Sequence, residues 1–369
     1  MATTTQAHDA QTVLGQPPMR ITEVDTPCVL IDLDVVQSNI ERLQTYLDSH
    51  GINNRPHIKT HKLPLIAKWQ VDAGAKGITV QSVGEAEVMA AAGIKDILIT
   101  YNVMGAEKIK RLAAVARMAN VRVAVDNAVA LAAVGAAAEL AGREIGFLIE
   151  FECGKKRQGV LTPEEVVELV DASSPYSHLR FLGILCYPSG PDVPAFVART
   201  RELLAGRGDL EVVSVGGTPG VWSAHETVGE TEHRAGTYVY NDRRSVAVGS
   251  ASVGDCALHV HVTLVSRPTA TRGVIDSGSK TLTSDGFPAK WGGGYGHILE
   301  YPEAVITELS EEHGAVDFSA CARVPEIGER LRVVPNHVCP VTNLHDEVYL
   351  HRGGVLEAVV PVAARGKTR

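Results

Sequence analysis

The sequence lacks long apolar runs and an excess of positive charge. None of its apolar stretches reaches the roughly 18–20 residues that a helix needs to cross a bilayer. The formal net charge is −8, which argues against nucleic acid or an anionic membrane as a partner. The first ten residues lack a basic segment followed by an apolar core, so they do not resemble an export signal. These absences predict a cytoplasmic enzyme that acts on a small molecule.

Paired cysteines and nucleotide-binding glycine motifs are also missing. The six cysteines are widely scattered without a Cys-x-x-Cys pair, which fits reduced thiols better than a disulfide framework. No early Gly-x-Gly-x-x-Gly occurs, which weakens a dinucleotide-binding interpretation. No Gly-x-x-x-x-Gly-Lys-Ser/Thr occurs either, so a bound phosphate would belong to a cofactor and not to a nucleotide.

Short apolar runs alternate with alanine-rich helical stretches from residue 29 to about residue 245. Two helices are expected at Val83–Ala92 and Ala106–Met118, where apolar residues recur at helical spacing. The alternation gives about eight βα units, which predicts an α/β fold with a closed (β/α)8 TIM-type barrel rather than an open doubly wound sheet. The expected strands are 55–59, 76–81, 96–101, 121–126, 145–151, 180–187, 211–215 and a short one at 236–240.

From about residue 255 the expected strands follow one another without long helices, and glycine and proline turns separate them. This pattern is typical of an antiparallel β domain. We therefore expect a barrel at 27–248, and a smaller β domain formed by 1–26 together with 249–369. The strands expected in the second domain are Ala257–Ser266, Arg272–Asp276, Arg330–Val334, Val348–His351 and Val355–Pro361.

Lys59 is the first candidate for catalysis. It lies in the segment Arg-Pro-His-Ile-Lys-Thr-His-Lys at 55–62, where a short apolar strand is expected to end. A lysine at the end of a buried strand can be desolvated, lose its charge near neutral pH and form a Schiff base with a carbonyl. The alternative is a solvated loop lysine, which is the common state of this residue type.

This segment, together with Asp-Thr-Pro-Cys-Val-Leu-Ile-Asp-Leu from Asp25, resembles the entry to fold-type III pyridoxal-phosphate (PLP) enzymes. It is most similar to the D-threonine aldolase and D-serine dehydratase branch of the alanine-racemase-like superfamily. In that branch the first lysine of Pro-His-x-Lys-x-His-Lys carries PLP, which implies Lys59 here. His61 of the same motif is a candidate base, with a structural loop histidine as the alternative. The resemblance covers nearly the whole chain, and we also expect a homodimer.

The loop from Glu152 to Val160 matches the family's loop with an arginine and a glycine near the cofactor. The resemblance implies that Arg157 lies on the cofactor side, and the alternative is a solvated surface arginine. Tyr187 closes an expected strand where the family often has a tyrosine near the pyridoxal ring. Its alternative is an aromatic residue that caps the barrel core.

A phosphate needs backbone N–H donors that no side chain obstructs. Gly216, Gly217 and Thr218 offer such donors directly after a strand, in the seventh βα unit, where phosphate sites of barrels frequently lie. The segment from Arg234 to Asp242 resembles the family's Arg-x-Gly-x-Tyr segment. We expect Tyr240 and Asn241 of this segment to complete the phosphate site.

His337 and Cys339 form the candidate metal site. On an extended segment these two side chains point the same way, so an imidazole and a thiolate can bind one divalent ion and leave positions open. The family places its catalytic metal at this Pro-x-His-x-Cys or Pro-x-His-x-Asp motif. The aldolases carry His-x-Asp, which suits Mn²⁺ or Mg²⁺, whereas the cysteine of the dehydratases favours Zn²⁺. The segments 276–281 and 343–346 look more aldolase-like.

Together these motifs predict a PLP- and metal-dependent lyase acting on β-hydroxy-D-amino acids. Cys339 favours dehydration of substrates such as D-serine or D-threonine to a 2-oxo acid and ammonia. The alternative is retro-aldol cleavage to glycine and an aldehyde. An amino-acid racemase of the same fold would need a second base and no metal. A non-catalytic PLP carrier would lack the β domain.

Overall fold

The computed structural model describes residues 19–369, which form two compact units. One unit comprises Asn39–Val239, Val248–Ser250 and Gly366–Arg369. The other comprises the described residues up to Ser38, Tyr240–Ala247 and Ala251–Arg365. Most of the expected N-terminal arm, residues 1–18, lies outside the described residues. Within residues 19–369, no helix has both the length and the apolar character needed to traverse a bilayer.

The first unit is built on a parallel sheet of eight strands, in the order β2-β9-β8-β7-β6-β5-β4-β3. The two end strands meet through a bridge between His57 and Thr79, so the sheet closes on itself. The backbone N–H of Thr79 also donates to the carbonyl of Pro56 at 2.8 Å. The expected barrel is confirmed. Its strands are β2 (Asn53–Asn54), β3 (Ile78–Val80), β4 (Asp96–Ile99), β5 (Asn120–Val125), β6 (Ile145–Glu150), β7 (Leu179–Leu185), β8 (Val212–Val215) and β9 (Glu232–His233).

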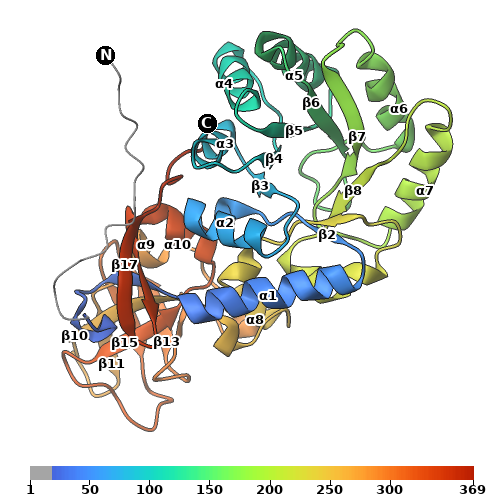
Figure 1. The fold of residues 1–369 in the computed structure, drawn as a ribbon. Helices are drawn as coiled ribbons and strands as arrows, with labels where there is room; N and C mark the ends of the chain where they lie inside the picture. Colours follow the sequence, from blue (N-terminus) through green and yellow to red (C-terminus); the bar gives the residue numbers. More distant parts are fainter. Residues whose placement is uncertain (1–18) are drawn as a thin grey trace, which may run out of the picture. The chain divides into compact units, whose positions relative to one another are not determined.

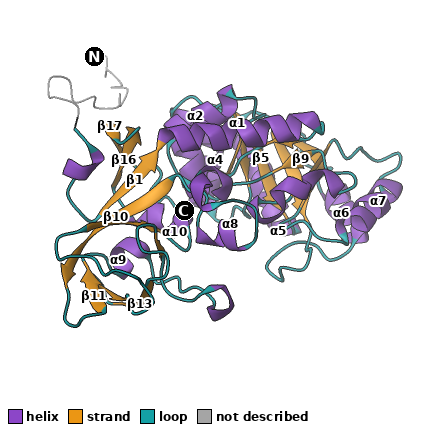
Figure 2. Ribbon diagram, turned by 90° about the horizontal axis from the view of Figure 1, so that it is seen from below, coloured by secondary structure: helices purple, strands orange, loops and turns teal. Residues whose placement is uncertain are grey.

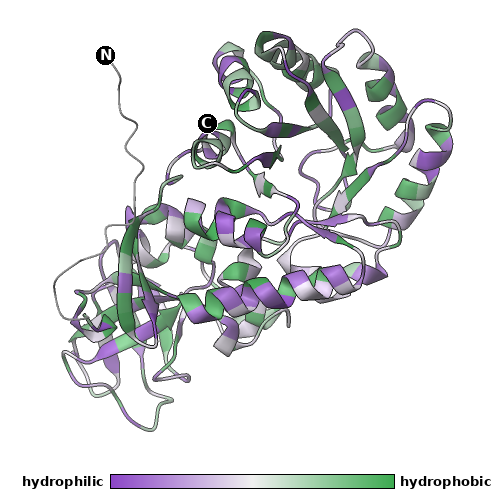
Figure 3. Ribbon diagram, viewed as in Figure 1, coloured by the Kyte–Doolittle hydropathy of each residue, from purple (hydrophilic) through white to green (hydrophobic). Residues whose placement is uncertain are grey.

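Helices follow the strands and lie outside them (Figures 1 and 2). Three begin at capping side chains: Ser82, Asn127 and Thr162 each accept a hydrogen bond from the backbone N–H three residues later. In Figure 3 the strands β6 and β7 are mainly hydrophobic, as expected for strands covered on both faces. The helices are α1 (Leu33–Ser49), α2 (Pro64–Asp72), α3 (Val83–Ala91), α4 (Ala106–Ala116), α5 (Ala128–Ala141), α6 (Pro163–Ala172) and α7 (Val193–Leu203).

Two expected barrel strands are wrong in position. Residues 55–59 lead into the 3-10 helix η2 (Ile58–Thr60), because the His57 side chain accepts the Lys59 N–H that a strand would offer to its neighbour. The strand expected at 236–240 is instead β9 at 232–233, followed by the 3-10 helix η4 (Thr237–Val239). There the backbone N–H of Tyr238 donates to the Thr218 hydroxyl at 3.1 Å.

A network of charges fills part of the barrel interior. Arg55 is fully buried and contacts Glu232 at 2.6 Å and Asp96 at 2.5 Å. Arg122 lies 3.2 Å from Asp96 and Ser214 donates to Glu232 at 2.7 Å, so both carboxylates have several partners. Removing Arg55 would take the 2.6 Å ion pair from the buried Glu232, and breaking a buried pair typically costs about 3–5 kcal/mol.

The second unit contains a nine-stranded sheet with the path β13-β14-β11-β10-β1-β16-β17, in which β15 pairs with β10 and with β12. Its pairs are antiparallel except β1 with β16, which confirms the expected antiparallel domain. Its strands are β1 (Cys28–Asp32), β10 (Leu258–Ser266), β11 (Arg272–Ile275), β12 (His297–Ile298), β13 (Val305–Leu309), β14 (Gly314–Asp317), β15 (Arg330–Val334), β16 (Glu347–Arg352) and β17 (Val355–Pro361). Its helices are α8 (Arg243–Ala247), α9 (Ser279–Leu282) and α10 (Val338–Leu344).

The expected domain boundary at residue 27 needs correction. Leu30 of β1 pairs with His259 on one side and with Tyr349 on the other, so this strand is central to the second sheet and is not part of the barrel. Residues 240–247 likewise belong to the second unit. The described part of the arm contacts β17, where Leu356 N–H donates to the carbonyl of Met19 at 2.9 Å.

Candidate cofactor and metal sites

Lys59 lies on η2, in the segment that follows β2, and is partly buried. Its backbone is held by His57, whose Nδ1 lies 3.4 Å from the Lys59 nitrogen. Burial, together with the charges of Lys59 and Arg234, lowers the pKa of His57 well below its usual range, so this imidazole is neutral and can accept the hydrogen bond. Sequence reasoning did not assign this role to His57, although the residue lies inside the motif.

Three of the predicted cofactor residues converge at one end of the barrel. Lys59 Nζ lies 5.9 Å from the ring centroid of Tyr187, which follows β7. The guanidinium carbon of Arg157, in the loop after β6, lies 5.6 Å from the same centroid. Glu150 at the end of β6 binds Arg157 at 3.2 Å and thus orients it. Side chains from three loops therefore surround one point at the carboxyl ends of the strands, where barrels carry their active sites.

The Gly216–Gly217 turn comes directly after β8 and lies against Tyr187. A Cβ on Gly217 would lie 2.6 Å from a ring carbon of Tyr187, and one on Gly216 would lie 2.1 Å from His233. Gly216 also has a φ of +78°, which favours glycine. The neighbouring hydroxyl of Thr218 accepts a hydrogen bond from Tyr238 and keeps its own proton for donation.

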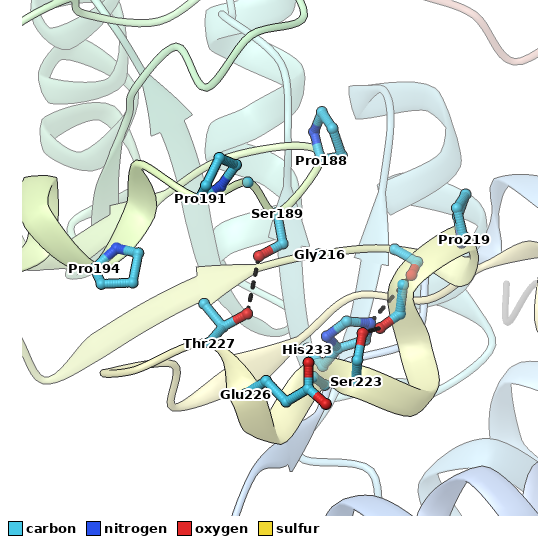
Figure 4. Close-up of a pocket in the computed structure, with 14 residues that line it drawn as sticks. Pro188, Ser189, Pro191, Pro194, Gly216, Pro219, Ser223, Glu226, Thr227 and His233 are labelled. Atoms are coloured by element: carbon cyan, nitrogen blue, oxygen red, sulfur yellow. Dashed lines mark hydrogen bonds between the residues drawn. The ribbon is translucent and has the colours of Figure 1, made fainter.

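A cavity of about 530 Å³ opens beside this turn. Figure 4 shows Gly216 and His233 on one side of it, and the hydrogen-bonded pair Ser189 and Thr227 on the other. Its lining combines residues that follow β7 and β8 with His233, the last residue of β9. It therefore lies at the same end of the barrel as Lys59.

These residues fit PLP. Lys59 supplies an amine for the aldehyde, and Tyr187 and Arg157 supply an aromatic face and a cation beside it. The glycine turn supplies backbone N–H groups with no side chain in the way, as a phosphate requires. The assignment of these residues to the cofactor stays a prediction that the geometry supports.

His61 is fully buried. Its Nδ1 accepts the Leu63 N–H at 3.0 Å, and its Nε2 contacts the Gln70 side chain at 3.2 Å. Burial lowers the pKa of His61 to about 3, so it stays neutral. These contacts support the structural alternative named above, and the catalytic role of His61 stays an untested prediction.

Tyr240 and Asn241 belong to the second unit, whereas the glycine turn belongs to the first. Tyr240 is fully buried, and its carbonyl accepts the Ala257 N–H at 2.7 Å. Asn241 has a φ of +49° and its amide donates to the carbonyl of Asp255 at 3.3 Å. Their contribution to phosphate binding stays a prediction.

His337 and Cys339 do not lie on the expected extended segment. His337 precedes α10, and Cys339 lies in its first turn together with Pro340, which a first turn tolerates because its N–H groups have no intrahelical partner. The two side chains still meet. Burial alone would lower the pKa of His337, but the hydrogen bond and charge of Cys339 raise it above its usual value.

Asp285 is a neighbour of this pair that the sequence did not reveal. Its Oδ2 lies 3.2 Å from His337 Nδ1, and Asn336, next to His337, donates to the carbonyl of Asp285 at 2.8 Å. A carboxylate on one imidazole nitrogen is the usual support for a metal on the other. Among the described residues, no cluster of three or more His, Cys, Asp or Glu side chains forms a metal site. The pair therefore fits an ion with two protein ligands and positions left for other ligands.

Comparison with known proteins agrees with this two-part architecture. Residues 31–244 match the family model "Alanine racemase, N-terminal domain", and residues 257–351 match "Putative serine dehydratase domain". A D-threonine aldolase of Arthrobacter sp. is 33% identical over 96% of this chain and 96% of its own length. The chain belongs to the D-threonine aldolase and D-serine dehydratase family of fold-type III PLP enzymes. It is a PLP-dependent lyase.

Members of this family with different reactions are about equally similar to the chain. The D-threo-3-hydroxyaspartate dehydratase of a Delftia species is 32% identical over 86% of this chain and 91% of its own length. A structure of such a dehydratase, a cysteine-to-alanine mutant in the metal-free form, has a TM-score of 0.83 and 28% identity over 93% of this chain and 99% of that one. Overall similarity therefore does not separate aldolase from dehydratase.

Proposed function

We propose that this lyase dehydrates β-hydroxy-D-amino acids of the D-serine or D-threonine type to a 2-oxo acid and ammonia. The observation that supports dehydration is the pairing of Cys339 with His337, because a thiolate and an imidazole suit Zn²⁺ better than Mn²⁺ or Mg²⁺. A divalent ion on these two residues would act as a Lewis acid on the β-hydroxyl of the substrate.

Each group of the chain has one task in this proposal. PLP, when bound, withdraws electrons from the bond that breaks at Cα. Lys59 Nζ would take the α-proton, and its partly buried place beside Tyr187 limits the water around it. Arg157, held by Glu150, and the Gly216–Gly217 turn would fix the orientation of the cofactor, which decides which substrate bond is aligned for cleavage.

Retro-aldol cleavage is the second candidate. It is favoured by the Arthrobacter relative, which is a D-threonine aldolase and matches this chain over almost its whole length. In that reaction the metal would acidify the β-hydroxyl, and a base would remove the hydroxyl proton while the Cα–Cβ bond breaks.

Incubation of the holoenzyme with D-threonine separates the candidates. We expect 2-oxobutanoate and ammonia, whereas glycine and acetaldehyde would establish the aldolase instead, and L-threonine would indicate a racemase. L-threonine and L-serine should be poor substrates. The Lys59→Ala variant is the control, because product formed by the enzyme must disappear with the lysine. Metal analysis of the purified protein tests the expectation of Zn²⁺.

A further inference from the structure

Two cysteines outside the predicted cofactor and metal residues lie close together beside the cofactor end of the barrel. Cys153 follows β6, in the loop that carries Arg157, and Cys186 lies between β7 and Tyr187. Both sulfur atoms contact the carbonyl oxygen of Pro188, at 2.7 Å for Cys153 and 3.4 Å for Cys186. A Cβ on Gly190 would lie 3.4 Å from the Cys153 carbonyl oxygen, so the two loops are also in backbone contact.

The environments of the two thiols differ in a way that suits oxidation. Cys153 is partly exposed, whereas Cys186 is buried. The hydrogen bond between the two side chains lowers the pKa of Cys153 and, with burial, raises the pKa of Cys186. The accessible Cys153 sulfur is thus the better nucleophile, and the nearby Cys186 sulfur can act as the resolving thiol.

We propose that Cys153 and Cys186 form a reversible disulfide when the protein meets a peroxide. The Cys153 thiolate attacks one peroxide oxygen and breaks the O–O bond, which gives a sulfenic acid and, after protonation, water. The Cys186 sulfur then attacks the Cys153 sulfur, and the hydroxide that leaves takes the Cys186 proton. Two thiols and one hydrogen peroxide become one disulfide and two waters.

This bond would act on the neighbouring site. It would tie the loop of Arg157 to the residue before Tyr187. The guanidinium of Arg157 lies over the ring of Tyr187, so the bond would act on both side chains. Forming an S–S bond requires the two sulfurs to leave the Pro188 carbonyl and come to about 2.05 Å from each other. We therefore expect Tyr187 and Arg157 to shift relative to Lys59 on oxidation, and turnover to fall severalfold. This second step rests on the placement of the cofactor proposed above.

Peptide mapping tests the bond without reference to activity. The holoenzyme is treated with hydrogen peroxide, free thiols are blocked with N-ethylmaleimide, and the protein is digested with trypsin without reduction. Trypsin would release Cys153 and Cys186 on separate peptides, 144–155 and 181–199, each without another cysteine. We expect these two peptides joined with a mass 2 Da below their sum, and released by dithiothreitol. Cys153 found only as sulfinic or sulfonic acid would overturn the proposal.

Turnover provides the second measurement. Peroxide should lower the rate of the wild type, and dithiothreitol should restore it. Cys153→Ser keeps a hydroxyl donor for Pro188 and should have normal turnover that resists peroxide. Cys321→Ser is the matched control, since this partly exposed cysteine lies in the other unit and its loss should leave the sensitivity unchanged. If peroxide inactivates Cys153→Ser as fast as the wild type, another cysteine such as Cys339 is the target. The regulatory role of the disulfide would then be wrong, even if peptide mapping finds the bond in the wild type.

Discussion

Lys62 Nζ lies 2.6 Å from Glu85 Oε1, and both side chains are buried. Glu85 also accepts the backbone N–H of Gln81 at 2.7 Å through its other oxygen. The second lysine of the motif is therefore held in an ion pair, whereas Lys59, three residues earlier, faces Tyr187. This difference separates the two lysines by structure as well as by position in the motif.

Borohydride reduction of the holoenzyme should therefore attach the cofactor to Lys59 alone. Peptide mapping of the reduced protein checks this, and a pyridoxyl group on Lys62 or Lys280 would contradict it. Lys62→Met is the matched variant. It should still be labelled at Lys59, but it should lose about 3–5 kcal/mol of unfolding free energy, because Glu85 is left as an unpaired buried charge.

Replacing Cys339 should affect the metal and spare the cofactor. In Cys339→Ala one of two predicted protein ligands is missing, so bound metal and turnover should both collapse while the PLP absorbance remains. Cys321→Ala, in the same unit, should keep wild-type metal content. Metal analysis and absorbance spectra of the three proteins decide the outcome, and a Cys339→Ala enzyme with full metal content would refute the site.

Cys339→Asp tests the link between ligand and reaction. An oxygen ligand suits Mn²⁺ and Mg²⁺, so this variant should bind those ions better than the wild type does. If the ligand also tunes the reaction, the products from D-threonine should shift from 2-oxobutanoate toward glycine and acetaldehyde. The measurement is the product ratio with each metal supplied in turn. An unchanged product ratio would mean that residues other than the metal ligand determine which substrate bond breaks.

The close contact of Gly217 with Tyr187 predicts a cost for any side chain there. In Gly217→Ala the new methyl would lie 2.6 Å from the ring, so the ring or the turn must move. Such overpacking costs about 1–3 kcal/mol, which corresponds to about thirtyfold weaker PLP binding if the middle of the range falls on the bound state. Gly220→Ala is the control, because its Cβ meets nothing within 4 Å. Spectroscopic titration of the two apoproteins with PLP would show equal affinities if the contact were unimportant.

Buried histidines in the second unit predict acid sensitivity. Burial, followed by the charges of neighbouring groups, lowers the pKa of His259 to about 4 and that of His261 to about 3, from 6.5 when exposed. The unfolded chain thus binds more protons below pH 6.5, so stability falls as the pH decreases from there toward 4 and 3. The expected loss at pH 5 is on the order of 2 kcal/mol for each histidine. The charges of Arg330, Arg332 and His351 add to this lowering of the pKa, whereas Asp32 and Glu300 oppose it at His259.

Unfolding by urea at pH 7 and at pH 5 measures this effect. A protein with His259→Gln and His261→Gln should lose less free energy between the two pH values than the wild type, even where its stability at pH 7 is lower. Equal losses in both proteins would assign the acid sensitivity to other groups.

Local patterns in the sequence were enough to predict the barrel, and the family resemblance implied that Arg157 and Tyr187 lie on the cofactor side with Lys59. The ends of parallel strands in a closed barrel meet at one face, so the strand order explains why the three side chains converge. The membership of β1 could not be predicted in this way, because its apolar residues would suit either sheet. Asp285 was missed for a different reason: its contact with His337 joins residues far apart in the chain, and no local spacing indicates it.

The central place of β1 in the second sheet also bears on how the chain is made. Leu30 has its partners in His259 and Tyr349, so β1 leaves the ribosome long before either of its neighbouring strands. Sheets dominated by such distant pairings form slowly. Until β16 arrives, β1 keeps an open edge that other chains can pair with, which makes partly synthesised or C-terminally truncated protein prone to aggregation. The barrel, whose strands lie within residues 53–233, has no such dependence on the C-terminal strands.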